Sequence, residues 1–212
     1  MTSTAFGIAL GLLVGLRHSF EPDHLTAVST LVHETRGLGG GALLGALWGV
    51  GHTLALVAVG LVLMLVGASL PERASAVFEL GVAAMLIVLG GRAIAIALRG
   101  APPSPGPVHA AVHRLAWRPL AVGVVHGLAG SGALTAIVFA DLPTAGARLL
   151  YMSLFGAGSI AGMALASGAA GATLRVLARS AGARRVLGVA TGALSVALGA
   201  MWSIPLWPRL GA

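Results

Sequence analysis

Four side chains that could bind a metal ion lie close together near the start of the chain. They are His18, Glu21, Asp23 and His24, and the residues before and after them are mainly apolar. Imidazole nitrogens and carboxylate oxygens together form a ligand set for divalent first-row metals such as nickel, cobalt, zinc or ferrous iron. Copper(I) prefers sulfur ligands, and magnesium prefers oxygen ligands alone. The cluster therefore indicates a transition-metal site.

Two further histidines lie inside apolar stretches and are candidate ligands of the same ion. His52 lies in one of them, and His126 begins a glycine-rich segment in another. Either histidine could instead be a packing group bonded to a backbone carbonyl, and Glu21 could instead face water at the cytoplasmic mouth of the site. The predicted metal ligands are His18, Asp23, His24, His52 and His126. The predicted supporting residues are Glu21, Thr53 and Ser131.

The composition places these residues inside a membrane protein. Of the 212 residues, 57% are hydrophobic and 9% are charged, whereas soluble domains carry about 25% charged residues. Cysteine and lysine are both absent, which excludes cysteine-ligated metal centres and the phosphate-binding loop of P-loop nucleotidases. The net charge of +7 comes from arginines at the ends of apolar runs, as membrane topology requires. We therefore expect a lipid bilayer, and neither nucleic acid nor nucleotide, as a partner.

Six apolar runs are long enough to cross a bilayer, which takes about 20 helical residues. They comprise residues 5–33, 40–69, 76–99, 119–140, 147–171 and 184–207. The first run has no charge before Arg17 and continues into the polar cluster, so we interpret it as a retained helix rather than a cleaved signal peptide. Glycines along the second and fifth runs should let helix backbones approach closely. These features predict an all-α integral membrane protein with a single domain over residues 1–212.

The polar segments of the first and fourth runs both contain residues that interrupt helices. Pro22 lacks a backbone donor and clashes with the preceding turn, so residues 20–23 should be unwound. The corresponding segment of the fourth run contains three glycines that also disfavour a helix: Gly127, Gly130 and Gly132. Broken helices at corresponding positions are typical of transporter binding sites. We therefore predict that the first and fourth helices are broken at the site.

The two halves of the chain resemble each other at a nearly constant offset. Residues 15–18, 47–52 and 80–83 align in order with residues 123–126, 154–159 and 187–190. Chance similarity among glycine- and alanine-rich helices is the alternative. Because each half has an odd number of spans, the second half should be inverted relative to the first, as in many secondary transporters. We place repeat one at about 5–99, a proline-rich loop at about 100–118 and repeat two at about 119–207.

The arginines divide unevenly between the two sides of the predicted bundle. Most of them lie in the loops after the odd-numbered spans, and the positive-inside rule makes those loops cytoplasmic. Both termini are then expected outside the cell (inner) membrane. Tryptophans are expected to anchor helix ends at the membrane interfaces; they are Trp48, Trp117, Trp202 and Trp207.

The motif GLRHSFEPDHLTAV, at residues 15–28, resembles the signature helix of the nickel/cobalt transporter family. Gly51-His52-Thr53 resembles the second motif of that family. Residues 126–131 resemble its short six-span branch of urease-accessory-like or nickel-transport-like membrane proteins. The resemblance covers nearly the whole chain, although longer members carry an acidic, threonine-rich motif in the second half that this chain lacks. It implies that His18, Asp23 and His24 form the metal site, with His52 nearby, and that nickel or cobalt is a transported substrate rather than a cofactor.

Together these features predict a secondary transporter (permease) for a divalent metal, with its site near the middle of the membrane, and not an enzyme. A non-transporting membrane accessory protein for metalloenzyme maturation is one alternative. An acyltransferase-like enzyme is another, because His18 and Asp23 have the spacing of a His-x4-Asp dyad. Such enzymes usually carry an extramembrane lobe, and no stretch here is long enough for one. The sequence leaves homo-oligomerisation open.

Overall fold

The computed structural model describes residues 2–31, 38–100, 117–142 and 144–211, with side chains throughout except at residues 2–8, 31, 130–141 and 211. These ranges contain helices and no strand, which confirms the all-α prediction. The elements are α1 (Thr2–His18), α2 (Pro22–Leu31), α3 (Leu38–Val66), α4 (Glu72–Arg99), α6 (Trp117–Asp141), α7 (Ala145–Leu177), α8 (Ala181–Ser203), the 3₁₀ helix η2 (Ile204–Leu206) and α9 (Trp207–Gly211).

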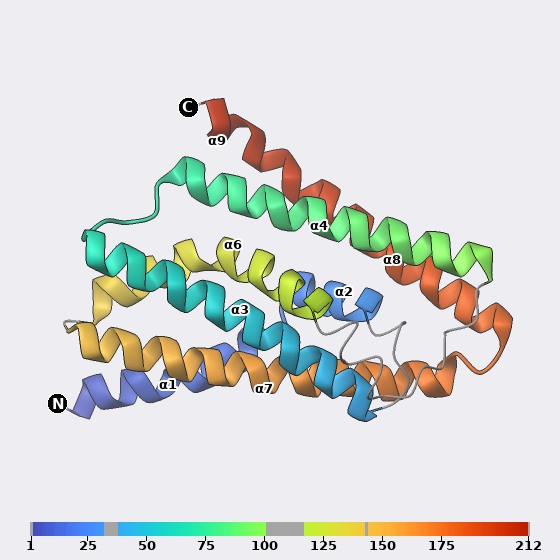
Figure 1. Ribbon diagram of the computed structural model, residues 1–212, viewed down its shortest axis with the longest axis horizontal. Coiled ribbons are helices and arrows are strands. Elements are labelled where there is room, and N and C mark those ends of the chain that lie inside the picture. The colour runs from blue at the N-terminus through green and yellow to red at the C-terminus, as the bar shows by residue number, and fades with distance from the viewer. Residues whose placement is uncertain (1, 32–37, 101–116, 143, 212) are drawn as a thin grey trace.

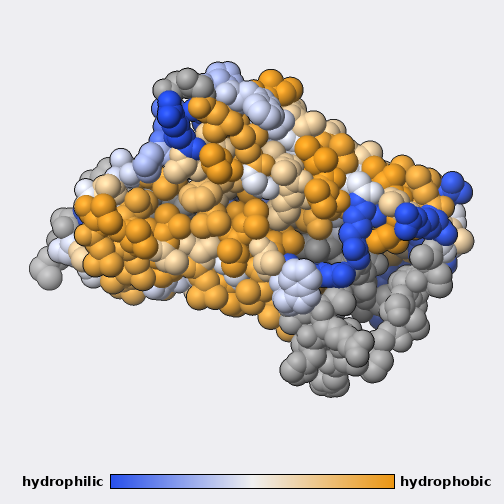
Figure 2. All heavy atoms as spheres, turned by 45° about the horizontal axis from the view of Figure 1, so that its top comes forward, coloured by the Kyte–Doolittle hydropathy of each residue, from blue (hydrophilic) through white to orange (hydrophobic). Residues whose placement is uncertain are grey.

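Four helical segments of the described chain are long and apolar enough to cross a membrane. They are α3, α4, α7 and the continuous segment Ala181–Leu210, which joins α8, η2 and α9. Large apolar side chains are exposed on these helices, and Figure 2 shows apolar residues over broad areas of the visible face. Leu65 and Val66, for example, are 86% and 70% exposed. An apolar surface of this extent is suited to lipid rather than water, so the chain is a membrane protein.

The first and fourth predicted spans correspond to α1 with α2 and to α6. Figure 1 shows the long helices running along the longest axis, with the N- and C-termini at the same end. Helix α3 packs against both α6 and α7, α1 packs against α7, and α4 packs against α8. The bundle is therefore held together by contacts between the two halves of the chain.

Glycines permit the closest of these helix contacts. A Cβ atom added at Gly123 would overlap the backbone carbonyl oxygen of Trp48, and one added at Gly15 would overlap that of Phe155. Small residues of this kind let helices associate in a membrane, where the hydrophobic effect does not drive them together. The contacts at Gly15 and Gly123 bring α1 onto α7 and α6 onto α3 around the polar residues.

The first helix is interrupted immediately before Pro22. Helix α1 ends at His18 and α2 begins at Pro22, and in the turn between them the Glu21 N–H donates to the His18 carbonyl over 3.0 Å. Proline suits the first position of a helix because its missing N–H would be unbonded there in any case. The unwound segment is thus residues 19–21 rather than the predicted 20–23, because Pro22 and Asp23 already lie in the first turn of α2.

The fourth helix is not interrupted, so the predicted break in it is wrong. Helix α6 is continuous from Trp117 to Asp141, through Gly127, Gly130 and Gly132. A Cβ atom at Gly127 would overlap the backbone carbonyl oxygen of His52 on α3. Gly127 therefore serves close helix packing, and the neighbouring helix offsets its poor intrinsic helix propensity.

Candidate metal site

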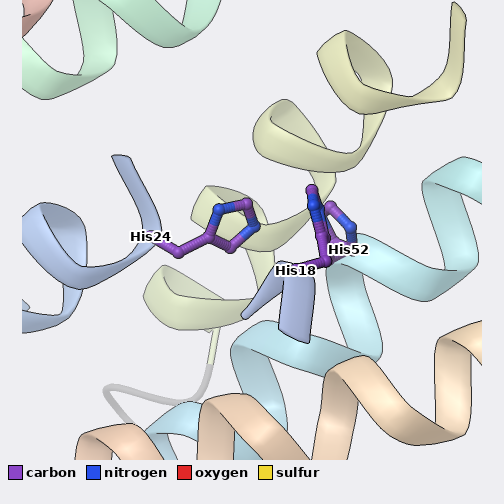
Figure 3. A group of neighbouring side chains, drawn as sticks. All are labelled: His18, His24 and His52. Carbon is purple, nitrogen blue, oxygen red and sulfur yellow. The ribbon is translucent and has the colours of Figure 1, made fainter. Parts of the chain in front are cut away.

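Four helices carry the candidate ligands to one place in the bundle. His18 is the last residue of α1, Asp23 and His24 are in the first turn of α2, and the others come from α3 and α6: His52 and His126. Figure 3 shows the imidazoles of His18, His24 and His52 close together on three different helices. All five side chains are buried except that of His18, which is 17% exposed.

The interruption between α1 and α2 is what allows His18 and His24 to meet. In an unbroken helix, residues six apart are separated by about 9 Å along the axis and lie on different faces. The ring centroids of His18 and His24 are instead 4.4 Å apart. The turn at residues 19–21 therefore brings the two imidazoles together as potential ligands.

Asp23 connects two of the imidazoles. Its Oδ1 lies 3.0 Å from Nδ1 of His24, and its Oδ2 lies 2.6 Å from Nε2 of His126. An ionised carboxylate can only accept hydrogen bonds, so both imidazoles donate to it. These two bonds orient the rings and leave Nε2 of His24 and Nδ1 of His126 as the remaining nitrogens.

Two overlapping groups of side chains have the spacing of metal ligands. The donor atoms of His18, His24 and His52 lie within 4.8 Å of one another, and so do those of Asp23, His24 and His126. His24 belongs to both groups. The rings of His24 and His126 are also close, with centroids 4.2 Å apart. The arrangement could hold one dication by three or more nitrogen and oxygen donors.

Several of these nitrogens are buried without a hydrogen-bond partner among the described residues. They are Nε2 of His18, Nε2 of His24, Nδ1 of His126 and both ring nitrogens of His52. Buried polar atoms in native proteins almost always have a partner, because leaving one unbonded costs about 1–3 kcal/mol. A metal ion would use the lone pairs of neutral imidazoles as ligands. The unpartnered nitrogens therefore support a metal site more strongly than a purely structural role.

Two aromatic side chains, Trp48 and Phe155, pack against the imidazoles, and the sequence did not predict these contacts. Trp48 was expected at a membrane interface, but it is 1% exposed and stacks on His24 at 5.4 Å between centroids and 23° between planes. The ring centroids of Phe155 and His18 are 5.3 Å apart. Trp48 precedes His52 by one helical turn, so the spacing i, i+4 could have placed it on the same face of α3.

The predicted supporting residues lie in different surroundings. Glu21 Oε2 lies 3.1 Å from Nδ1 of His18 and its side chain is 52% exposed, so it belongs to the rim of the cluster. The Thr53 hydroxyl donates to the Gly156 carbonyl on α7 over 3.3 Å and thus joins two helices. The side chain of Ser131 lies outside the described part of the structure.

Fold and site together define an all-helical membrane protein with a buried histidine–aspartate cluster. A protein named urease accessory protein UreH, from Bacillus sp. (strain TB-90), is 32% identical to the chain over 164 residues, which make up 74% of this chain and 72% of the relative. The chain belongs to the nickel/cobalt transporter-like family of this relative. It is therefore an accessory or transport protein and not an enzyme. No family model matches the chain, and no solved structure matches it.

Proposed function

We propose that the chain is a permease that moves a divalent transition-metal ion, nickel or cobalt, across the cell membrane. The observation that carries this proposal is the convergence of unpartnered, buried imidazole nitrogens beside the Asp23 carboxylate. Ionisable groups inside a membrane protein are costly to insert, at about 2.5–3.5 kcal/mol each on insertion scales, and they usually mark a substrate pathway. The nitrogen-rich donor set favours nickel and cobalt over magnesium, and the family resemblance favours the same two metals.

The packing of the helices supports an inverted repeat. Helix α1 contacts α7 as α6 contacts α3, and α2 contacts α8 as α6 contacts α4, which are equivalent pairs when the two halves are aligned. The glycine contacts follow the same rule, because Gly15 faces the carbonyl of Phe155 and Gly123 faces that of Trp48. Inverted repeats allow one half to rock against the other around a central site. Six spans arranged in this way would expose the imidazoles to each side of the membrane in turn.

The distribution of arginines supports an orientation with both termini outside. The connection from α7 to α8 lies at the opposite end from the termini (Figure 1), and Arg175, Arg179 and Arg184 lie at or beside it. Positively charged connections remain on the cytoplasmic side of the cell membrane. An inside-negative potential would then favour uptake of a dication by about 4.6 kcal/mol per 100 mV.

Purified protein in liposomes tests this proposal directly. With an inside-negative potential, wild-type protein should accumulate radiolabelled nickel or cobalt, and His24→Ala should abolish accumulation because His24 belongs to both ligand groups. Ser29→Ala is the matched control, because Ser29 lies on the same helix and its hydroxyl donates to the Thr26 carbonyl. Equal accumulation by wild-type and His24→Ala protein would refute the site.

A second candidate is a metal-binding accessory protein that does not transport. The name of the 32% identical relative, urease accessory protein, favours it. It requires the same buried ligands but no alternation of access. An accessory protein would bind nickel in equilibrium titrations but would not move nickel into the lumen of liposomes. A permease would bind nickel and also move it into the lumen.

A further inference from the structure

A cavity of about 530 Å³ connects the candidate metal site with the exterior of the bundle. His24 and His126 line its buried part. Glu79 of α4 and Arg209 of α9 also line it, and their side chains are 36% and 46% exposed. Helix α4 begins at the end of the bundle that also holds the termini (Figure 1), and Glu79 follows the start of α4 by about two helical turns. The cavity is therefore a route from that end to the buried imidazoles.

Glu79 and Arg209 form an ion pair at the mouth of this cavity. Nη1 of Arg209 lies 3.8 Å from Oε2 of Glu79, and the Ser75 hydroxyl donates to Oε1 of Glu79 over 3.0 Å. Ser75 thus orients the carboxylate without neutralising it. An ion pair that is long and partly exposed contributes little to stability. A hydrated dication could therefore replace the guanidinium on Glu79 at small cost.

The C-terminal segment holds Arg209 in this position. Pro205 lies in η2, at the point where α8 ends, and the neighbouring Leu206 is 4% exposed. Both η2 and α9 contact α4. Because a buried leucine anchors the segment beside α4, the backbone at Arg209 stays close to α4 and keeps the guanidinium within reach of Glu79.

The charges along the cavity favour a cation. Among the described residues that line it, three carboxylates and one guanidinium carry formal charge; they are Glu21, Asp23, Glu79 and Arg209. A cleft with an excess of one charge sign and apolar walls concentrates ions of the opposite sign. Glu21 pairs with His18 and Asp23 pairs with His24 and His126, so Glu79 is the carboxylate in this group that faces a guanidinium.

We propose that Glu79 captures the hydrated dication at the mouth of the cavity, and that Arg209 holds this carboxylate until the dication displaces it. This inference rests on the proposed function, because it assigns the access route of the same ion. Glu79 is a positioning residue on the path and not a ligand of the buried site. It therefore governs how fast the ion arrives, while the imidazoles and Asp23 govern how tightly the ion is held.

Transport kinetics in liposomes separate these two roles. Glu79→Gln should raise the KM for nickel by roughly three- to tenfold, the scale of a local steering charge, with the maximal rate and the equilibrium affinity of the buried site unchanged. Arg209→Gln should lower KM, because it frees Glu79, and the double variant should behave like Glu79→Gln. Matched controls are Glu72→Gln, on the same helix, and Arg185→Gln, at the opposite end of the bundle; both should match wild type.

Chemical modification provides a test of the charge alone. The chain contains no cysteine, so Glu79→Cys introduces a single thiol. A methanethiosulfonate reagent that adds a sulfonate should return KM toward the wild-type value, and a reagent of similar size that adds a quaternary ammonium should not. Identical effects of the two reagents would overturn the proposal, as would an unchanged KM in Glu79→Gln.

The association rate of nickel with detergent-purified protein distinguishes failure of this inference from failure of the transport function. If wild-type protein binds nickel but moves none, transport is refuted, and a slower association rate in Glu79→Gln still supports capture by Glu79. If wild-type protein transports and Glu79→Gln associates with nickel at the wild-type rate, only the role of Glu79 is refuted. Protein that neither binds nor transports nickel would refute both.

Discussion

The two segments that open the halves of the chain, α1–α2 and α6, reach the same site by different means. Each contributes a histidine at an equivalent position of the aligned halves, His18 and His126. The first segment is interrupted before Pro22 and adds Asp23 and His24 to the cluster. Helix α6 is continuous, and among its described side chains His126 is its one contribution to the ligand groups.

The difference shows what each kind of backbone provides. An interrupted helix can aim side chains from two of its turns at one point, as His18 and His24 do. A continuous helix presents fewer side chains to that point, but it can approach its neighbour more closely, as α6 approaches α3 at Gly123 and Gly127. We infer that α1–α2 supplies most of the ligands of the metal ion, and that α6 supplies a rigid helix that fixes the position of His126 beside it.

The largest expected effect is at Asp23, in the interrupted segment. Asp23→Asn keeps the shape of the side chain but removes the charge that accepts hydrogen bonds from His24 and His126. Nickel affinity in equilibrium titrations should fall roughly 100-fold, at the upper end of what removal of a ligand's partner costs. Glu21→Gln is the control, because Glu21 is half exposed at the rim. Equal losses in both variants would mean that negative charge near the site sets the affinity, and not the two hydrogen bonds that Asp23 accepts.

The next test compares His126 with its counterpart His18. Each alanine variant should weaken nickel binding by roughly tenfold or more. His126→Ala should also lower the free energy of unfolding by about 1.5–3 kcal/mol, because it removes a buried bond to a carboxylate. His18→Ala should lower it by less than about 1 kcal/mol, since its bond is to the half-exposed Glu21. Chemical denaturation in detergent measures both; equal destabilisation would remove the distinction between the segments.

A third test asks whether the glycines of α6 serve packing. Gly127→Ala should destabilise the protein by about 1–3 kcal/mol, because the new methyl group would overlap the His52 carbonyl oxygen and push α6 from α3. Gly91→Ala is the control, because a Cβ there meets nothing within 4 Å. It should be neutral or stabilising by up to about 1 kcal/mol, according to helix propensity. Thermal unfolding of the two variants decides the matter, and a stabilised Gly127→Ala protein would contradict the packing role.

The smallest effect is expected at Thr53, which neighbours His52 without joining the ligand groups. Thr53→Val removes the hydrogen bond to the Gly156 carbonyl and should cost about 0.5–1.5 kcal/mol of stability. Nickel affinity should stay within about twofold of wild type, a difference well under 1 kcal/mol. A loss as large as that of His126→Ala would show instead that the Thr53 hydroxyl helps to hold the ion.

Much of the molecule could be predicted from local patterns. The apolar runs placed the helices within a few residues, because helix length in a membrane follows from its thickness. Pro22 correctly indicated an interruption beside the polar cluster. The glycines of α6 misled, because a low helix propensity is only a weak indication when a neighbouring helix packs closely against them. Trp48 was wrongly predicted to lie at a membrane interface. Composition alone does not say which face of α3 turns toward α2 and α6.

By itself, the sequence determined that this is a helical membrane protein and which residue types could bind a dication, since both follow from chemistry that acts along the chain. Only the tertiary structure decided which of these residues meet. His126 and Asp23 are 103 residues apart in the sequence, yet Nε2 of His126 lies 2.6 Å from Oδ2 of Asp23. Their meeting depends on close contacts of α1 with α7 and of α6 with α3 at particular glycines. Such contacts depend on how the faces of different helices fit together, and no local pattern encodes that fit.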